Sequence, residues 1–169
     1  MDVSKLPEFD NHELVTVIAD KKVGLRGYIA IHNTNLGPAT GGTRYWHYLS
    51  SEDAIRDVLR LSKAMTYKCA LANVPYGGGK GVIMANSYHS RKHDLLVSYA
   101  SMVNLLNGNF YTGEDVGLTQ EHINILAQNS RFIIGRKRLA GDPSPWAALG
   151  VFHAIYAGLD AVFGNSVVA

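Results

Sequence analysis

Cysteine is nearly absent from this 169-residue sequence, which contains only Cys69. A disulfide within the chain is therefore excluded, which fits the reducing cytoplasm where we expect the protein to reside. Basic residues are scattered in short groups and the formal net charge is only +2, so no nucleic-acid partner is predicted.

No apolar run approaches the roughly 20 residues that span a bilayer. Residues 1–10 also lack the apolar core of an export signal, so we expect no membrane association.

Common phosphate-binding and metal-binding motifs are also absent. The Walker motif fails because Val74 and Gly81 stand where it needs a glycine and a hydroxyl residue. The dinucleotide fingerprint G-x-G-x-x-G fails in the same segment, because Val82 stands at its last glycine. His89 and His93 have the spacing of two ligands on a helix, but the residue after His89 is not the glutamate that the zinc motif requires. We therefore interpret both histidines as surface residues and predict no metal site.

What the sequence does contain is the pattern of an α/β protein. Hydrophobic residues make up 47% of the chain, as in ordinary globular domains. Apolar periodicity and cap signals predict strands at 14–19, 25–32, 82–84, 110–112 and 132–134, and helices at 50–65, 94–106, 119–128 and from 143 onward. The first two strands flank a polar turn and predict an antiparallel hairpin, while the later alternation favours parallel strands. We expect a mixed sheet in a three-layer α/β/α arrangement.

Three segments combine residues that could act on a ligand: KAMTYK at 63–68, YGGGKG at 76–81 and TGEDVG at 112–117. Lys68 shares a helix face with Met65, which indicates either a ligand contact or a lysine that reaches solvent from the helix end. Lys80 lies among glycines, which let neighbouring backbones approach closely. This pattern indicates either a lysine in a ligand site or an exposed lysine in a glycine-rich turn. Asp115 follows the end of a predicted strand, where α/β proteins bind ligands. The alternative is an acidic loop residue that contacts no ligand.

In this order and spacing, the segments resemble the glutamate/leucine/phenylalanine/valine dehydrogenases. The resemblance extends over about residues 29–164 and also rests on LGPATGGTRYW, LSKAMTYKCALANVPYGGGKGV and PSPWAALGV. It implies an NAD-dependent, homo-oligomeric enzyme that oxidises an L-amino acid to the 2-oxo acid and ammonia. By this resemblance, residues 1–142 form a substrate-binding and oligomerisation domain, and residues 143–169 a helix leading to a Rossmann domain that the sequence lacks.

The resemblance also implies roles for individual residues. Lys68 would bind the substrate carboxylate, with Gly42 and Met65 lining the site. Lys80 would be the catalytic lysine, and Asp115 would exchange protons with the substrate amine beside the nicotinamide. These types suit the chemistry, because a carboxylate requires a fixed cation and amine oxidation requires a base near neutral pH. Burial beside a second lysine would lower the pKa of Lys80 toward that range.

Three positions depart from the family pattern. Ala147 stands where a threonine usually contacts the cofactor. Thr40 and Gly113 stand where leucine-type members carry a larger apolar residue and an alanine, so the sequence favours a bulky apolar or aromatic amino acid. Because the nucleotide fingerprint is missing, we expect the 169-residue chain alone to be inactive and not to bind NAD. The alternative is a non-catalytic amino-acid-binding or oligomerisation module derived from the same family.

Overall fold

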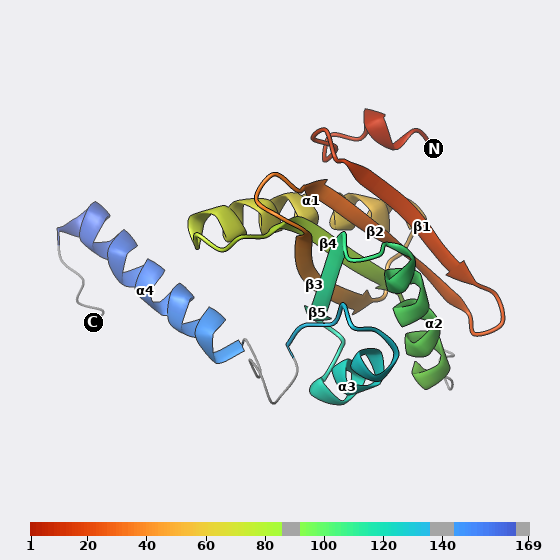
Figure 1. The fold of residues 1–169 in the computed structure, drawn as a ribbon. Helices are drawn as coiled ribbons and strands as arrows, with labels where there is room; N and C mark the ends of the chain where they lie inside the picture. The colour runs from red at the N-terminus through yellow and green to blue at the C-terminus, as the bar shows by residue number, and fades with distance from the viewer. Residues whose placement is uncertain (86–91, 136–143, 165–169) are drawn as a thin grey trace.

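The computed structural model describes residues 1–85, 92–135 and 144–164. Five strands form one mixed sheet in the order β1-β2-β4-β3-β5, with the remaining elements placed around it (Figure 1). The elements are a short 3-10 turn Val3–Lys5, β1 Leu14–Asp20, β2 Leu25–Asn33, β3 Ala39–Trp46, α1 Ser51–Leu71, β4 Gly77–Met84, α2 Lys92–Leu105, β5 Phe110–Glu114, α3 Gln120–Asn129 and α4 Ser144–Phe163. The β1–β2 and β2–β4 pairs are antiparallel, whereas β3 pairs in parallel with both β4 and β5. The predicted hairpin and mixed sheet are thus confirmed.

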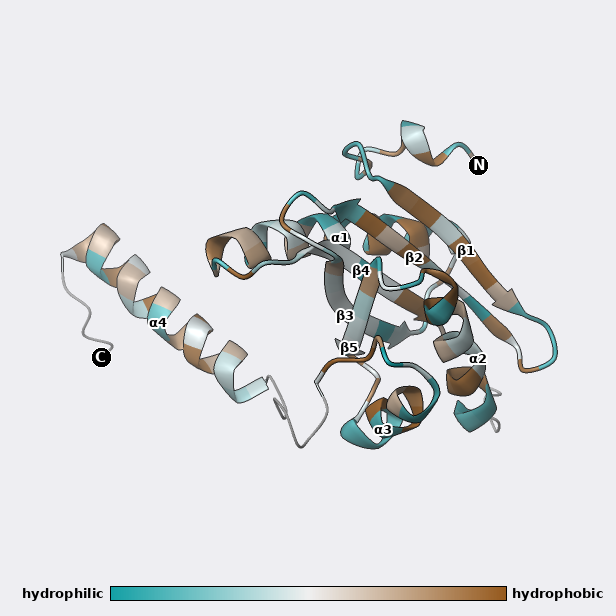
Figure 2. Cartoon of the chain, viewed as in Figure 1, coloured by the Kyte–Doolittle hydropathy of each residue, from teal (hydrophilic) through white to brown (hydrophobic). Residues whose placement is uncertain are grey.

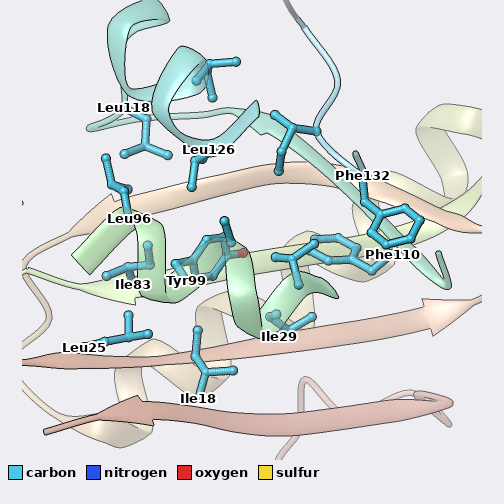
Figure 3. Packing of buried hydrophobic residues seen from close by; sticks show 14 of the residues in the cluster. Ile18, Leu25, Ile29, Ile83, Leu96, Tyr99, Phe110, Leu118, Leu126 and Phe132 are labelled. Carbon is cyan, nitrogen blue, oxygen red and sulfur yellow. The ribbon is translucent and has the colours of Figure 1, made fainter. Parts of the chain in front are cut away.

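Helices cover both faces of the sheet, as the three-layer expectation requires. On one face, Tyr28 and Val82 of the sheet pack with Val58 and Leu59 of α1. On the other face, the larger cluster joins the sheet to α2 and α3, with Tyr99 at its centre (Figure 3). Central strands are therefore buried on both sides, and residues 27–32 of β2 are accordingly buried in succession rather than at every second position.

Helix α1 begins where its cap signal predicts. The Ser50 hydroxyl accepts a hydrogen bond from the backbone N–H of Asp53 at 3.0 Å, and Glu52 and Asp53 place acidic groups in the first turn. The helix extends beyond the predicted end and stops before Asn73, which takes the left-handed backbone conformation with φ of 52°. This longer helix carries Lys68 in its last turn.

Glycine-rich strands are the main difference from the sequence-based prediction. β3 lies where the sequence analysis predicts no strand, and β4 begins at Gly77 rather than at Val82. A Cβ on Gly41 would overlap the backbone oxygen of Gly79, and one on Gly78 would overlap Thr66 of α1. These glycines are therefore strand residues that allow neighbouring backbones to meet. The predicted strand at 132–134 is wrong as a strand, because only an isolated bridge joins Ile133 to the sheet.

Helix α4 lies apart from the sheet (Figure 1), and Figure 2 shows hydrophobic residues along its length. Trp146 is 73% exposed and Val162 is 72% exposed. By length and composition this helix could cross a bilayer, so the expectation that no segment qualifies is wrong. A helix packed between domains of a soluble protein has the same apolar composition, so these properties alone do not identify a membrane segment. The predicted start at Pro143 lies outside the described residues.

Candidate functional site

A cavity of about 750 Å³ is bordered by β3, β4, the end of β5, the C-terminal half of α1 and the first turn of α4. Alternation along β4 determines which side chains reach it, because Gly78 faces Thr66 of α1 whereas Gly81 faces Tyr99 of α2. Lys80 therefore lies on the α1 side. The lining contains all eight residues singled out from the sequence: Thr40, Gly42, Met65, Lys68, Lys80, Gly113, Asp115 and Ala147.

Lys80 is the most deeply buried charged group of this cavity, with a side chain only 6% exposed. Its Nζ lies 3.2 Å from Oδ1 of Asp115. Burial lowers the pKa of Lys80 below its ordinary value, Asp115 partly opposes this effect, and the positive charge of Arg44 lowers the pKa further. The neighbouring cation that contributes is thus an arginine rather than the second lysine expected from the sequence. A buried lysine of this kind releases its proton more readily than an exposed one.

Asp115 lies directly after β5 and is held from several sides. Its Oδ2 accepts a hydrogen bond from Nε of Arg44 at 2.9 Å, while Oδ1 faces Lys80. A Cβ on Gly42 would lie 2.8 Å from Cβ of Asp115 and would also overlap the backbone oxygen of Glu114. Glycine at position 42 therefore lets the loop after β5 lie close to β3. The sequence pattern alone does not reveal this packing role.

Lys68 and Met65 line the cavity from the last turns of α1. Met65 packs over β3, where its Cγ would lie 3.0 Å from a Cβ on Gly41. Lys68 is exposed, and among the described residues no carboxylate forms an ion pair with it. Its ammonium group is therefore a cation at the cavity without a protein counter-ion in the described part of the chain. This position can bind an anionic group of a ligand by a charge-assisted hydrogen bond.

Residues 12–132 match the family model described as Glu/Leu/Phe/Val dehydrogenase, dimerisation domain. The chain belongs to this family. It is 44% identical over 149 residues to L-tryptophan dehydrogenase of Nostoc punctiforme, covering 88% of this chain and 42% of that protein. It is 40% identical over 171 residues to a phenylalanine dehydrogenase of Caldalkalibacillus thermarum, covering 99% of this chain and 46% of that protein.

Leucine dehydrogenase of Geobacillus stearothermophilus is 39% identical over 168 residues, which cover 98% of this chain and 46% of that protein. The crystal structure of L-tryptophan dehydrogenase from Nostoc punctiforme superimposes with a TM-score of 0.73 and 40% identity, covering 92% of this chain and 44% of that one. The chain thus spans less than half the length of these relatives. Both the fold and the sequence agree with the N-terminal part of this dehydrogenase family.

Thr40 and Gly113, the two positions from which the sequence analysis predicts a bulky substrate, both line the cavity. The Thr40 hydroxyl donates to the backbone oxygen of Tyr111 at 3.3 Å, so it serves the β3–β5 contact. A Cβ on Gly113 would lie 3.0 Å from the backbone oxygen of Ile134 and 3.2 Å from its Cγ1. The space left by this glycine is therefore taken up partly by Ile134. Together with Val116, Ile134 gives this wall of the cavity an apolar character.

The cofactor-facing position predicted from the family pattern lies at the cavity rim. Ala147 is in the first turn of α4, and Ser144 and Trp146 of the same turn also line the cavity. A methyl group at position 147 offers no hydrogen bond. The first turn of α4 therefore supplies an apolar group at the position where the family resemblance predicts a hydroxyl.

The described residues contain no group of three or more histidine, cysteine and acidic side chains that could hold a metal ion. His93 lies on the exposed start of α2, and His89 lies outside the described residues. Cys69 is buried next to Lys68, and burial raises the pKa of its thiol. A raised pKa disfavours the thiolate, which agrees with the interpretation of Cys69 as a packed side chain.

The sequence pattern does not identify Arg44 and Ile134 as site residues. Arg44 follows Thr40 and Gly42 at intervals of two along β3, so the alternation of a strand could have placed it on the same face. That signal was hidden because the glycines of β3 argue against a strand. Ile134 has no local signal, since the segment that carries it is held beside β5 by backbone hydrogen bonds, among them the one from its N–H to the oxygen of Thr112 at 2.8 Å.

Proposed function

We propose that this chain is the substrate-binding and catalytic-residue part of an NAD-dependent dehydrogenase of apolar or aromatic L-amino acids. The observation that carries the proposal is the meeting of Lys68, Lys80 and Asp115 around one cavity. Family membership supports the reaction class, and the names of the relatives support the substrate class. In this scheme residues 1–142 bind substrate, and residues 143–169 lead toward the nucleotide-binding part.

Each charged residue has a distinct task in this reaction. The Lys68 ammonium binds the substrate carboxylate, which fixes the amino acid at the end of α1. Asp115 accepts a proton from the substrate ammonium through Oδ1, the oxygen that Arg44 leaves available. Lys80, whose pKa is lowered by burial, then removes a proton from the water that adds to the oxidised carbon. The apolar wall at Ile134 and Val116 contacts the substrate side chain.

The fit of NAD to the described residues is partial. Ala147 and its neighbours in the first turn of α4 would form the rim beside the nicotinamide. When bound, the cofactor supplies the acceptor for the substrate hydride. Within this sequence no glycine-rich fingerprint is available for the pyrophosphate, so a second domain would have to bind the rest of the cofactor.

Ligand binding by the 169-residue chain tests the first step. We expect L-tryptophan and L-phenylalanine to bind with a dissociation constant on the order of 1 mM, measured by ligand-detected NMR. Lys68→Ala should abolish this binding. Lys63→Ala is the matched control, because Lys63 lies on the same helix but pairs with Asp10 at 2.9 Å, away from the cavity. Equal binding by both variants would contradict the role of Lys68.

Activity of the full-length gene product tests the reaction itself. If the reading frame continues into a nucleotide-binding domain, the product should reduce NAD in the presence of an apolar or aromatic L-amino acid. Lys80→Ala should lower kcat by about 10² to 10⁴, the usual contribution of a general base. Lys63→Ala should leave kcat unchanged. Full activity of Lys80→Ala would refute the assignment.

A non-catalytic binding or oligomerisation module is the second candidate. Three features favour this candidate: the methyl group of Ala147 at the rim, the exposed apolar residues of α4 and the edge strand β1. Each of them could contact another protein chain. Under both candidates we expect self-association, in keeping with the dimerisation domain that the chain matches. Sedimentation of the chain as a monomer at high concentration would contradict this expectation. NAD reduction by the full-length product would separate the two candidates.

A further inference from the structure

Arg44 links the cavity to a second buried carboxylate. From β3, its Nε donates to Oδ2 of Asp115 and its Nη1 donates to Oδ2 of Asp57, each at 2.9 Å. The Arg44 side chain is only 20% exposed, and that of Asp57 is 10% exposed. Two nitrogen atoms of one rigid guanidinium thus contact two separate carboxylates. A lysine ammonium at the end of a flexible chain does not reproduce this fork.

Asp57 fixes the position of the guanidinium. Besides Arg44, its carboxylate accepts hydrogen bonds from the Tyr48 hydroxyl at 2.6 Å and from Nε of Arg60 at 2.9 Å. These donors come from β3, α1 and the segment between them, so the carboxylate is anchored by several elements. A buried carboxylate with this many partners is costly to move. Arg44 is therefore anchored on one side and free to hold Asp115 on the other.

We propose that Arg44 is a positioning residue, which holds Oδ2 of Asp115 so that Oδ1 alone is directed toward Lys80 and the ligand. This inference rests on the proposed function, in which Asp115 and Lys80 exchange protons with substrate and water. Asp115 lies in the loop after β5, where backbone structure alone does not fix a carboxylate rotation. Without Arg44, both oxygens of Asp115 become available to Lys80, and the carboxylate can turn away from the substrate amine.

The charges around Lys80 give this proposal a measurable consequence. Asp115 faces it from the loop after β5, Arg44 from β3 and Asp57 from α1, while Lys68 lines the same cavity. Removing the positive charge of Arg44 takes away a group that lowers the pKa of Lys80. It also releases Asp115 to pair more closely with Lys80. Both effects stabilise the ammonium form of Lys80, so its pKa should rise.

The first test measures the reactivity of Lys80 in the 169-residue chain. Acetic anhydride labels only unprotonated amines, so peptide mapping over a pH series gives the titration of Lys80, with Lys68 as an internal reference. We expect Arg44→Met to lower the labelling of Lys80 severalfold near pH 8 and to move its profile to higher pH. Arg44→Lys, which keeps the charge but not the two-carboxylate contact, should restore part of the profile.

The matched control is Arg60→Met. Arg60 also pairs with Asp57, but it makes no contact with Asp115, so the Lys80 profile should stay at the wild-type position. An unchanged profile in Arg44→Met would overturn the proposal. An equal change in Arg60→Met and Arg44→Met would overturn it as well, because the effect would then come from the ion-pair cluster around Asp57 in general.

The second test separates positioning from charge in the full-length gene product. Arg44→Lys should lower kcat by about ten- to a hundredfold, as expected for a displaced catalytic group, and leave KM for the amino acid near wild type. Arg60→Met should change neither constant. Wild-type kcat in Arg44→Lys would refute the positioning role. If the wild-type product has no dehydrogenase activity, the proposed function is wrong. The labelling profile then still decides whether Arg44 lowers the pKa of Lys80.

Discussion

Replacing His12 with glutamine should reduce the pH dependence of folding stability between pH 7.5 and 5.5. The His12 ring is buried, with Nδ1 accepting from the backbone N–H of Asp10 at 3.1 Å and Nε2 lying 3.0 Å from the backbone oxygen of Leu59. These partners require the neutral ring with its proton on Nε2. Burial lowers the pKa of His12 below its ordinary value of 6.5, and the nearby His32 lowers it further.

The sign of the effect follows from proton binding. Below pH 6.5 the unfolded chain protonates His12 while the folded chain still excludes the proton, so stability falls as pH falls. The slope is at most about 1.4 kcal/mol per pH unit, and it vanishes below the folded-state pKa, where both states are protonated. The contribution of the neutral His12 ring to folding stability is therefore fully present above pH 6.5. Over the single unit from pH 6.5 to 5.5, the loss from this group is at most about 1 kcal/mol.

Urea unfolding at pH 7.5, 6.5 and 5.5 measures this loss. Wild type should lose more unfolding free energy over this range than His12→Gln, although the variant starts lower by about 1–3 kcal/mol because a buried hydrogen bond is altered. Substitution of the exposed His153 by glutamine is the control, and it should keep the wild-type slope. If His12→Gln and wild type lose stability in parallel, the buried neutral histidine is not the cause.

Four further substitutions test the packing of the sheet and of the cavity. Gly78→Ala should destabilise the chain by about 3 kcal/mol in urea unfolding, since the added methyl overlaps Thr66 and α1 must move; no change would contradict the close contact. Tyr99→Phe should cost about 1–2 kcal/mol, because the fully buried Tyr99 hydroxyl bonds the hydroxyl of Thr43 at 2.6 Å; an equally stable variant would show that this bond contributes nothing. In the full-length product, Gly113→Ala should lower the kcat/KM ratio of tryptophan to leucine by roughly tenfold, and Ile134→Val should restore part of it; an unchanged ratio would refute the assignment of this wall.

The sequence predicts the parts of the fold that depend on local patterns. The β1–β2 hairpin and the N-cap of α1 are encoded by neighbouring residues, and both appear where expected. β3 and the start of β4 could not be predicted in this way. Their glycines argue against strands when taken alone, and they become favourable only because Gly41 lies against the backbone of Gly79 and Gly78 against α1. That contact exists only in the folded sheet.

The candidate site likewise contains residues that the sequence identifies and residues that only the fold brings together. Lys68, Lys80 and Asp115 were singled out through a family resemblance, because spacing alone left an ordinary surface interpretation open for each of them. Arg44 stands 71 residues before Asp115 in the chain, and only the parallel register of β3 with β5 brings the two together. Ile134 reaches the cavity through a single bridge beyond the last strand. Contacts of this kind have no local sequence signal.

The charges of the cavity support the proposal that its ligand is an amino acid rather than a simple acid or amine. Among the described residues, the ammonium of Lys68 has no carboxylate partner, so it favours an anionic group at the end of α1. Asp115 offers Oδ1 about 3.2 Å from Lys80, and an ammonium group of the ligand placed there would meet a carboxylate whose other oxygen is already held by Arg44. A zwitterion can contact both positions at once, whereas a monocarboxylic acid or a simple amine contacts only one of them. Because charge-assisted hydrogen bonds are stronger than the contact of a single methyl group, the loss of either ligand charge should weaken binding more than the loss of a methyl group from the side chain.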